Sequence, residues 1–327
     1  MSRLVAAFIS PRVVAAFEYR GASKGIAIVR SVEQFGAFAS PHAAAEQLVA
    51  LLHDADVRRA NVSVTLRGFG VAQQLVSLSP QDGADPAPAI QRKLDQLESA
   101  PDVRVAWLET PFSPDEMTDA PALHQLLAVA APTTVLDAVL TAITSAGHRV
   151  THVTTTAVAA QRLQEELGQP GDATALVAPL PDGAVLAFFN GGWLRLVAEP
   201  ADYDGHAPTA SALAEEAELG ATYLRQQFRG AELSQIFLAA PTGSAMDLEV
   251  ELSERLGVPV VRFESQLSVG ALMALGGALD SFGPTPLSLH LRAARMRGEM
   301  LRVLGLAGAV LAVAAAVLAL YLAWKRG

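Results

Sequence analysis

Residues 126–163 read LLAVAAPTTVLDAVLTAITSAGHRVTHVTTTAVAAQRL and decide the fold class. The apolar run 126–131 is typical of a buried strand, and the Pro-Thr pair after it begins a helix that ends before Gly147. A second strand at 148–154 and a second helix at 156–167 follow directly. Because strands that alternate with helices usually form a sheet covered by those helices, this stretch predicts an α/β fold.

The rest of the chain follows one plan twice: strands joined by turns, then helix–strand alternation. Residues 13–19 and 26–32 are predicted strands, and Ser40 before Pro41 is typical of a helix N-terminus. In the second half, Asp-Gly and Asn-Gly-Gly turns join three strands within residues 173–199. The shared plan predicts two related lobes.

A Gln-Pro-Gly-Asp turn after residue 168 is the predicted hinge between these lobes. We divide the chain at this turn and at the ends of the other patterned segments. The predicted parts are a first lobe at 1–168 with a small inserted subdomain at about 67–110, a second lobe with a closing helix at 169–280, a linker at 281–302, and a membrane helix at 303–324.

Composition excludes several classes of function. The 327 residues carry a net charge of −9 and have no block of Lys and Arg with interleaved aromatic residues, so nucleic-acid binding is not expected. The chain has no cysteine, which excludes disulfides and thiolate nucleophiles. The apolar run 4–9 is short for a secretory leader and ends at Pro11, so secretion is the disfavoured alternative.

The apolar stretch near the end of the chain predicts a membrane anchor. It runs for about 22 uncharged residues from Val303 to Trp324 and, as a helix, would be about 33 Å long, enough to cross a bilayer. Tyr321 and Trp324 suit the membrane interface. Four arginines precede the stretch and only Lys325 and Arg326 follow it, which predicts a single-pass protein with a cytoplasmic body.

Several stretches resemble PilM-type proteins, which have the two-lobed actin-like (ribonuclease H-like) fold. Residues 126–163 are similar to their central segment, 61–78 (NVSVTLRGFGVAQQLVSL) to the start of their small subdomain, and 234–263 and 266–279 to their last strands and closing helix. The resemblance implies a scaffold of a type IV pilus or type II secretion assembly platform at the bacterial inner membrane. GspL-type proteins of that kind combine such a domain with one membrane helix.

The linker extends the resemblance. PilM-type proteins bind a short apolar peptide of their partner PilN, ahead of its basic stretch and membrane helix, and residues 286–300 (PLSLHLRAARMRGEM) stand in the same relation to the tail. Leu287, Leu289 and Leu291 alternate, so an extended segment would direct them to one side for docking. The implied partners are a motor ATPase, inner-membrane platform proteins and a second copy of the chain. Such anchors usually carry an extracytoplasmic domain; we expect either that the natural chain continues into one or that another subunit supplies it.

An actin-like ATPase needs two hairpins, each led by an Asp, around the phosphates, and a glycine-rich turn at the adenosine. The first hairpin is expected at 16–25, where Phe17 or Glu18 stands at the Asp position and bulky Tyr19 and Arg20 follow. In the second, at 178–183, Ala178 or Pro179 takes the Asp position. The third is the turn at 239–243. The residues left in these degenerate loops are Glu18, Gly21, Ser23, Asp182, Gly183 and Gly243.

These losses predict a protein without catalysis and without a bound cofactor. Three alternatives stay open: ATP binding without turnover, a membrane-anchored actin-like or sugar-kinase-like ATPase, and a polymerising actin homologue. His148 and His152 would share a strand face, but no acidic ligand lies near them in sequence, so core or surface histidines are favoured over a metal site. An acidic stretch at 215–218 is either a solvated helix face or a docking surface for a basic partner.

Overall fold

The computed structural model describes residues 3–22, 25–78, 90, 102–110, 124–167, 173–200, 208–240, 246–263, 267–283 and 286–289. All of them belong to one compact unit, Met1–Leu289. The predicted membrane helix at 303–324 and the basic part of the linker lie outside the described residues. Among the helices that the structure does describe, none is long and apolar enough to span a bilayer.

The first lobe is built on a five-stranded sheet with the strand order β3-β2-β1-β4-β8. The first three strands pair antiparallel, whereas β4 and β8 run parallel to β1. The strands are β1 (Arg3–Ile9), β2 (Val13–Ala22), β3 (Gly25–Phe35), β4 (Ala60–Leu66) and β8 (Arg149–Thr155), with helices α1 (Pro41–Asp54) and α3 (Thr133–Ser145) beside them. Ser40 caps α1 as predicted, because its hydroxyl accepts a hydrogen bond from the Ala43 backbone N–H at 3.1 Å.

Strand β1 is the element that sequence reasoning missed. The run 4–9 was considered only as a leader segment, yet it forms the central strand of the sheet, and residues 5–9 are fully buried. A strand buried on both faces is apolar without alternation, so its sequence does not show the period of two expected for a strand with one solvated face.

The second lobe has the same strand order in its five-stranded sheet, β11-β10-β9-β12-β13. Again the three strands that come first in the chain, β9, β10 and β11, pair antiparallel, whereas β12 and β13 run parallel to β9. Its elements are β9 (Ala173–Leu180), β10 (Gly183–Asn190), β11 (Trp193–Ala198), β12 (Leu233–Leu238), β13 (Val260–Arg262), α5 (Ala210–Gln227) and α6 (Met246–Leu256). The two sheets therefore repeat one topology, which makes their hairpins comparable position by position.

A third, antiparallel sheet has the order β5-β7-β6, from β5 (Ala72–Leu78), β7 (His124–Pro132) and β6 (Val103–Thr110). The predicted subdomain ended at about residue 110, whereas β7 is the middle strand of this sheet. The strand predicted at 126–131 therefore belongs to this antiparallel sheet, and the helix and strand after it are as predicted. The run is apolar because both of its faces are buried: Leu127, Val129 and Ala131 pack in one core, and Leu126, Ala128 and Ala130 pack in another.

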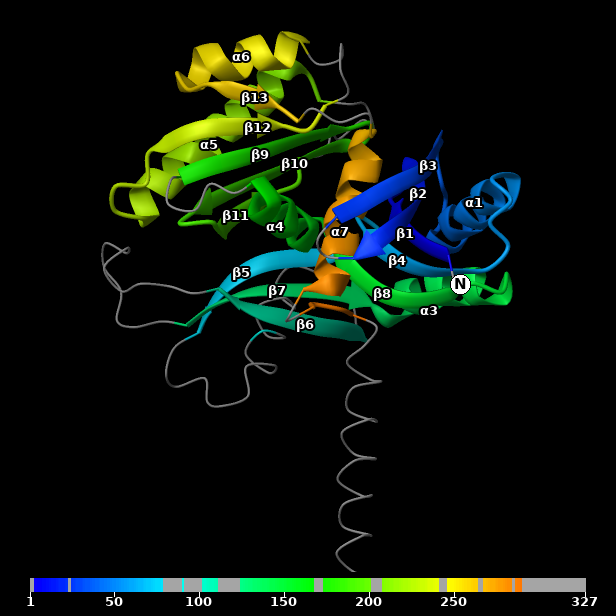
Figure 1. Cartoon of the computed structure of the whole chain (residues 1–327). Helices are drawn as coiled ribbons and strands as arrows, with labels where there is room; N and C mark the ends of the chain where they lie inside the picture. Colours follow the sequence, from blue (N-terminus) through cyan, green and yellow to red (C-terminus); the bar gives the residue numbers. More distant parts are fainter. Residues whose placement is uncertain are drawn as a thin grey trace, which may run out of the picture. The chain divides into compact units, whose positions relative to one another are not determined.

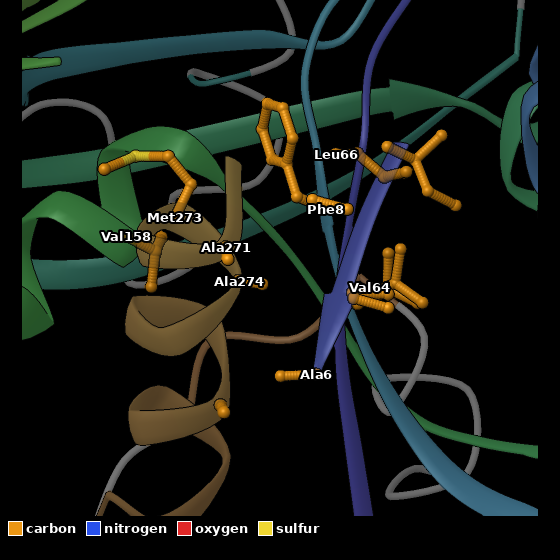
Figure 2. Packing of buried hydrophobic residues seen from close by; sticks show 14 of the residues in the cluster. Ala6, Phe8, Val64, Leu66, Val158, Ala271, Met273 and Ala274 are labelled. Atoms are coloured by element: carbon orange, nitrogen blue, oxygen red, sulfur yellow. The ribbon is translucent and has the colours of Figure 1, made fainter. Parts of the chain in front are cut away.

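Two helices join the lobes: α4 (Thr156–Leu167) and α7 (Val269–Phe282). Helix α7 packs on β1, β2, β4 and α4 and also reaches β9, so it lies between the two five-stranded sheets (Figure 1). Figure 2 shows Ala271 and Ala274 of α7 beside Ala6 and Phe8 of β1. Helix α7 approaches α4 closely at Gly276, where a Cβ would overlap the backbone oxygen of Ala159, so this contact requires glycine.

Candidate functional site

The site lies where the first hairpin of one sheet meets the first hairpin of the other. In the second lobe this is the β9–β10 turn, Pro181 and Asp182, closed by the pairing of Leu180 with Gly183. Gly183 has a φ of 140°, a conformation that other residues rarely adopt, so the turn depends on it. By the shared strand order, the equivalent turn in the first lobe is β1–β2, at residues 10–12.

The β1–β2 turn uses its own backbone donors. The Ser10 hydroxyl accepts hydrogen bonds from the N–H groups of Arg12 and Val13, at 3.3 and 3.0 Å. The Ser10 N–H donates to the Val13 carbonyl, and Pro11 has no N–H. Gly68 lies against the Pro11 ring so closely that a Cβ there would overlap it. No backbone N–H of residues 10–13 is left to bind an anion.

Arg67 spans the space between the two turns. It follows β4, and its backbone N–H donates to the Ile9 carbonyl at 3.1 Å, which places it beside the β1–β2 turn. Its guanidinium Nη1 lies 2.6 Å from Asp182 Oδ1 of the opposite turn, and its Nε lies 3.7 Å from Glu199 Oε1. The side chains of Arg67 and Asp182 are only 5% and 10% exposed, so this ion pair is shielded from water.

Glu199 ties the third sheet into the same contact. The Thr156 hydroxyl at the start of α4 donates to Glu199, and Gln73 of β5 donates to that hydroxyl at 2.7 Å. Gln73 also accepts from the Ala157 N–H at 2.9 Å. Burial raises the pKa of Glu199, against the opposing influence of Arg67 and of the hydrogen bonds from Thr156 and Gln73. We call Arg67, Asp182, Glu199, Thr156 and Gln73 the interlobe cluster.

A second buried cluster surrounds Asp280 at the end of α7. Its Oδ2 lies 2.8 Å from His152 Nε2, and its Oδ1 accepts a hydrogen bond from Arg162 Nε at 2.8 Å. The Leu287 N–H donates to Oδ2 at 2.9 Å. His152 is therefore a core histidine paired with a carboxylate. His148 is also buried, and burial lowers its pKa from the usual value. We call Asp280, His152 and Arg162 the Asp280 cluster.

The segment 286–289 lies along the outer edge of β8. The Leu289 N–H donates to the Val153 carbonyl at 2.9 Å, and the Val153 N–H donates to the Ser288 hydroxyl at 3.1 Å. Leu287 and Leu289 are both buried in the core of the first lobe. The segment thus adds to the sheet at its open edge, with a serine hydroxyl taking the place of a backbone acceptor. Leu291 lies outside the described residues.

A cavity of about 410 Å³ opens in the second lobe beside the end of β9. Pro179, Leu213, Met246 and Leu248 supply apolar walls, and Asp247 supplies the one carboxylate. Gly243, predicted in the adenosine turn, lies outside the described residues.

Comparison with known proteins agrees with this architecture. No family model and no curated protein matches the chain. Among solved structures, the "PilM-PilN type IV pilus biogenesis complex" matches with a TM-score of 0.67 and 18% identity, covering 86% of this chain and 99% of that one. A Bacteroides thetaiotaomicron protein with an actin-like ATPase fold and unknown function gives 0.54 and 8%, covering 85% and 95%.

The chain has the actin-like fold. The cytoplasmic domain of EpsL, an inner-membrane component of the type II secretion system of Vibrio cholerae, matches as well, with a TM-score of 0.50 and 16% identity over 88% of this chain and 98% of that one. The predicted fold class is confirmed for the described residues. At these identities the likeness concerns the fold alone.

The hairpin expected at 16–25 is the β2–β3 hairpin, whereas the turn at which Arg67 meets Asp182 of the second lobe is β1–β2. Glu18 lies opposite Val5 within the sheet, and Gly21 lies near the β2–β3 turn, at the end of β2 farthest from the β1–β2 turn. Glu18 is buried between Arg3 of β1 and Arg30 of β3, whose Nε atoms lie 3.6 and 3.3 Å from its Oε1 and Oε2, so its ion pairs link three neighbouring strands. Ser23 lies outside the described residues. Because its apolar sequence did not identify β1 as a strand, the β2–β3 hairpin was predicted to be the first hairpin of the lobe.

The second hairpin was predicted correctly in position, and Asp182 and Gly183 lie in it. The residues that sequence reasoning missed are Arg67, Glu199, Asp280 and Arg162. Two of them carried a signal: Arg67 is a charge directly after a buried strand, and Asp280 is the one charge in an otherwise apolar helix. Charges in such positions are buried only if they are paired.

Proposed function

We propose that this chain is a non-catalytic, membrane-tethered scaffold of a type II secretion or type IV pilus assembly platform. In this role it links cytoplasmic components, including a motor ATPase, to platform proteins in the bacterial inner membrane. The observation that carries the proposal is the ion pair of Arg67 with Asp182 between the two facing hairpins.

The interlobe cluster argues against nucleotide turnover. A nucleotide phosphate entering between the hairpins would meet two carboxylates, Asp182 and Glu199, and would have to draw Arg67 away from both. The β1–β2 turn offers no backbone N–H in exchange, whereas phosphate loops depend on such donors. Like charges in a shielded site repel strongly, so a phosphate is disfavoured there.

The segment 286–289 supports the tethered role. Its pairing with β8 fixes the chain to the body directly before the basic stretch and the apolar stretch 303–324. A force on the anchor would therefore reach the first lobe through backbone hydrogen bonds and two buried leucines. This arrangement suits a PilM-type body that carries its own PilN-like segment. A second copy of the chain is a further expected partner.

The first test titrates the full chain in detergent with Mg²⁺-ATP, measuring the heat of binding by calorimetry and turnover by release of phosphate. The second test purifies the chain from its native cells and identifies the proteins that accompany it. We expect no binding heat, no turnover and co-purification of pilus or secretion platform proteins. Magnesium-dependent ATP binding with turnover would overturn the non-catalytic role, and the absence of every platform protein would overturn the assignment to such a machine.

The cavity beside β9 favours a membrane-anchored ATPase or sugar-kinase-like enzyme as the second candidate, because an apolar slot could hold a nucleoside base. If ATP does bind, Ala210→Trp, which fills this cavity, should abolish binding under that candidate. The matched variant Ala212→Trp, on the exposed side of the same helix, should leave it unchanged.

A further inference from the structure

The outer layer of the second lobe consists of α5 and α6. Alternate residues of β9 and β10 divide between two cores: Val177 and Phe188 pack with α5 and α6, whereas Leu176 and Phe189 face the core shared with the first lobe. Helix α4 lies on that inner side, in contact with β10 and β11. The outward sides of α5 and α6 therefore have no part of the described chain packed over them.

The two helices lie side by side and run in the same direction. Their N-terminal ends meet at the cavity, which Ala210 and Leu213 of α5 line together with Met246 and Leu248 of α6. Farther along, Arg255 Nη1 of α6 lies 3.2 Å from Glu218 Oε2 of α5. Both contacts together keep the outward sides of the helices next to each other as one surface, which we call the outer helix face.

Large apolar side chains are exposed on the outer helix face in helical register. Leu219 and Tyr223, one turn apart on α5, are 59% and 43% exposed. Met246 and Val250, one turn apart on α6, are 63% and 50% exposed. Each helix thus exposes a pair of large apolar side chains at spacing i, i+4 outside the stripe that packs on the sheet, and such a pair is what a partner helix can pack against.

The charge of the same face limits what can cover it. Helices α5 and α6 together have a net charge of −5, out of −9 for the whole chain. Glu249 is paired with Arg262 of β13 and Glu218 with Arg255, whereas Glu215 and Glu216 are exposed. Glu215 and Glu216 precede Leu219 by one turn, so the apolar stripe of α5 is flanked by negative charge. Bilayer surfaces and nucleic acids are themselves anionic and are repelled, as is the same face of a second copy.

We propose that the outer helix face docks a basic amphipathic helix of a partner protein. Apolar side chains of that helix would cover Leu219 and Tyr223, and its Lys and Arg residues would pair with Glu215 and Glu216. Apolar anchors at the centre of an interface supply most of the affinity, and complementary charges supply orientation and a fast encounter. The inference goes beyond the scaffold role and rests on α5 and α6 alone, so it holds or fails separately from that role.

The test measures binding of a fluorescent 18-residue peptide to the full chain in detergent by anisotropy. The peptide has leucines along one helical face and lysines elsewhere, and a control peptide of the same composition has its leucines scattered. We expect the first peptide to bind at least tenfold tighter. Leu219→Ser with Tyr223→Ser should weaken binding about tenfold, and Glu215→Lys with Glu216→Lys should weaken it and reduce its dependence on salt.

Matched variants on the first lobe distinguish binding at the outer helix face from non-specific apolar and electrostatic binding of the peptide. Phe35→Ser removes another exposed apolar side chain, and Glu46→Lys with Asp54→Lys reverses two exposed carboxylates. Both should change affinity less than twofold. Equal binding of the scattered peptide, no binding at all, or equal losses in these controls would overturn the proposal.

The chain's own basic linker is the rival occupant. If Arg292, Arg295 and Arg297 already cover the outer helix face, changing all three to Ser should tighten peptide binding several-fold. We expect no change, because the occupant is a separate protein; a clear gain in affinity would replace the partner by the linker and overturn the proposal.

Discussion

The two buried clusters differ in their numbers of acidic and basic side chains. In the interlobe cluster one arginine, Arg67, faces two carboxylates on elements from the other lobe. In the Asp280 cluster one carboxylate faces Arg162 and His152, and the side chains of Asp280 and His152 are almost completely shielded. The interlobe cluster joins two lobes that could separate, whereas the Asp280 cluster lies inside the core, beside the segment 286–289. We infer that the Asp280 cluster holds the fold and that the interlobe cluster holds the lobes together.

The largest expected effect comes from Asp280→Ala. The change leaves Arg162 and His152 buried without their shared carboxylate and removes the acceptor of the Leu287 N–H, which should cost about 3–5 kcal/mol of unfolding free energy. Urea unfolding of the full chain in detergent measures it. Asp54→Ala, at an exposed carboxylate, should change stability by less than about 0.5 kcal/mol. A loss below about 1 kcal/mol for Asp280→Ala would mean that the cluster is not the tie we infer.

Arg67→Met should have the next largest effect, about 2 kcal/mol, because the remaining carboxylates can gain water when the lobes part. Its signature should be local: faster amide exchange at the β1–β2 and β9–β10 turns, with the core strands unchanged. Adding Asp182→Asn should restore part of the loss, since the two changes act on one ion pair. Arg58→Met, at an exposed arginine, is the control. Uniform exchange across both lobes would remove the distinction between the clusters.

Leu289→Asp should have a smaller effect, about 1–2 kcal/mol, because the segment can leave β8 and take the new charge into water. Limited proteolysis near residue 289 should become faster. Leu219→Asp places the same charge on an exposed position and should leave proteolysis there unchanged. If the Leu289 variant is cut no faster than the original protein, docking of the segment does not depend on that side chain.

The smallest effect is a change in pH dependence caused by Glu199→Gln. Burial raises the pKa of Glu199 above its ordinary value of 4.5 in the folded protein, so the native state holds this proton more tightly than the unfolded chain. Its contribution to stability is therefore fully present below about pH 4.5 and is lost as pH rises through the raised pKa. Relative to Glu199→Gln, the original protein should lose stability as pH rises above about 4.5 and through the raised pKa of Glu199. Parallel stability curves from pH 4 to 8 would contradict this.

Local patterns predicted most elements. The strand and helix patterns at 148–154 and 156–167, the Ser40 cap and the Asp-Gly and Asn-Gly-Gly turns all predicted elements that the structure confirms. The failures occurred where strands are buried on both faces: β1 was considered only as a leader segment, and β7 lies outside the predicted bounds of the subdomain whose sheet it joins. Consecutive residues of both strands are buried, so their sequences are apolar throughout and do not show the period of two.

The sequence by itself determined the fold class, the doubled plan of strands and the alternating leucines ahead of the apolar tail, because these depend on periodicity and on residues near one another in the chain. Only the tertiary structure decided which hairpins face each other, and that Arg67, Asp182 and Glu199 meet between them. The same holds for Asp280, whose partners come from β8, α4 and the segment after α7. Pairing of buried charges depends on which elements pack together, and no local pattern encodes that.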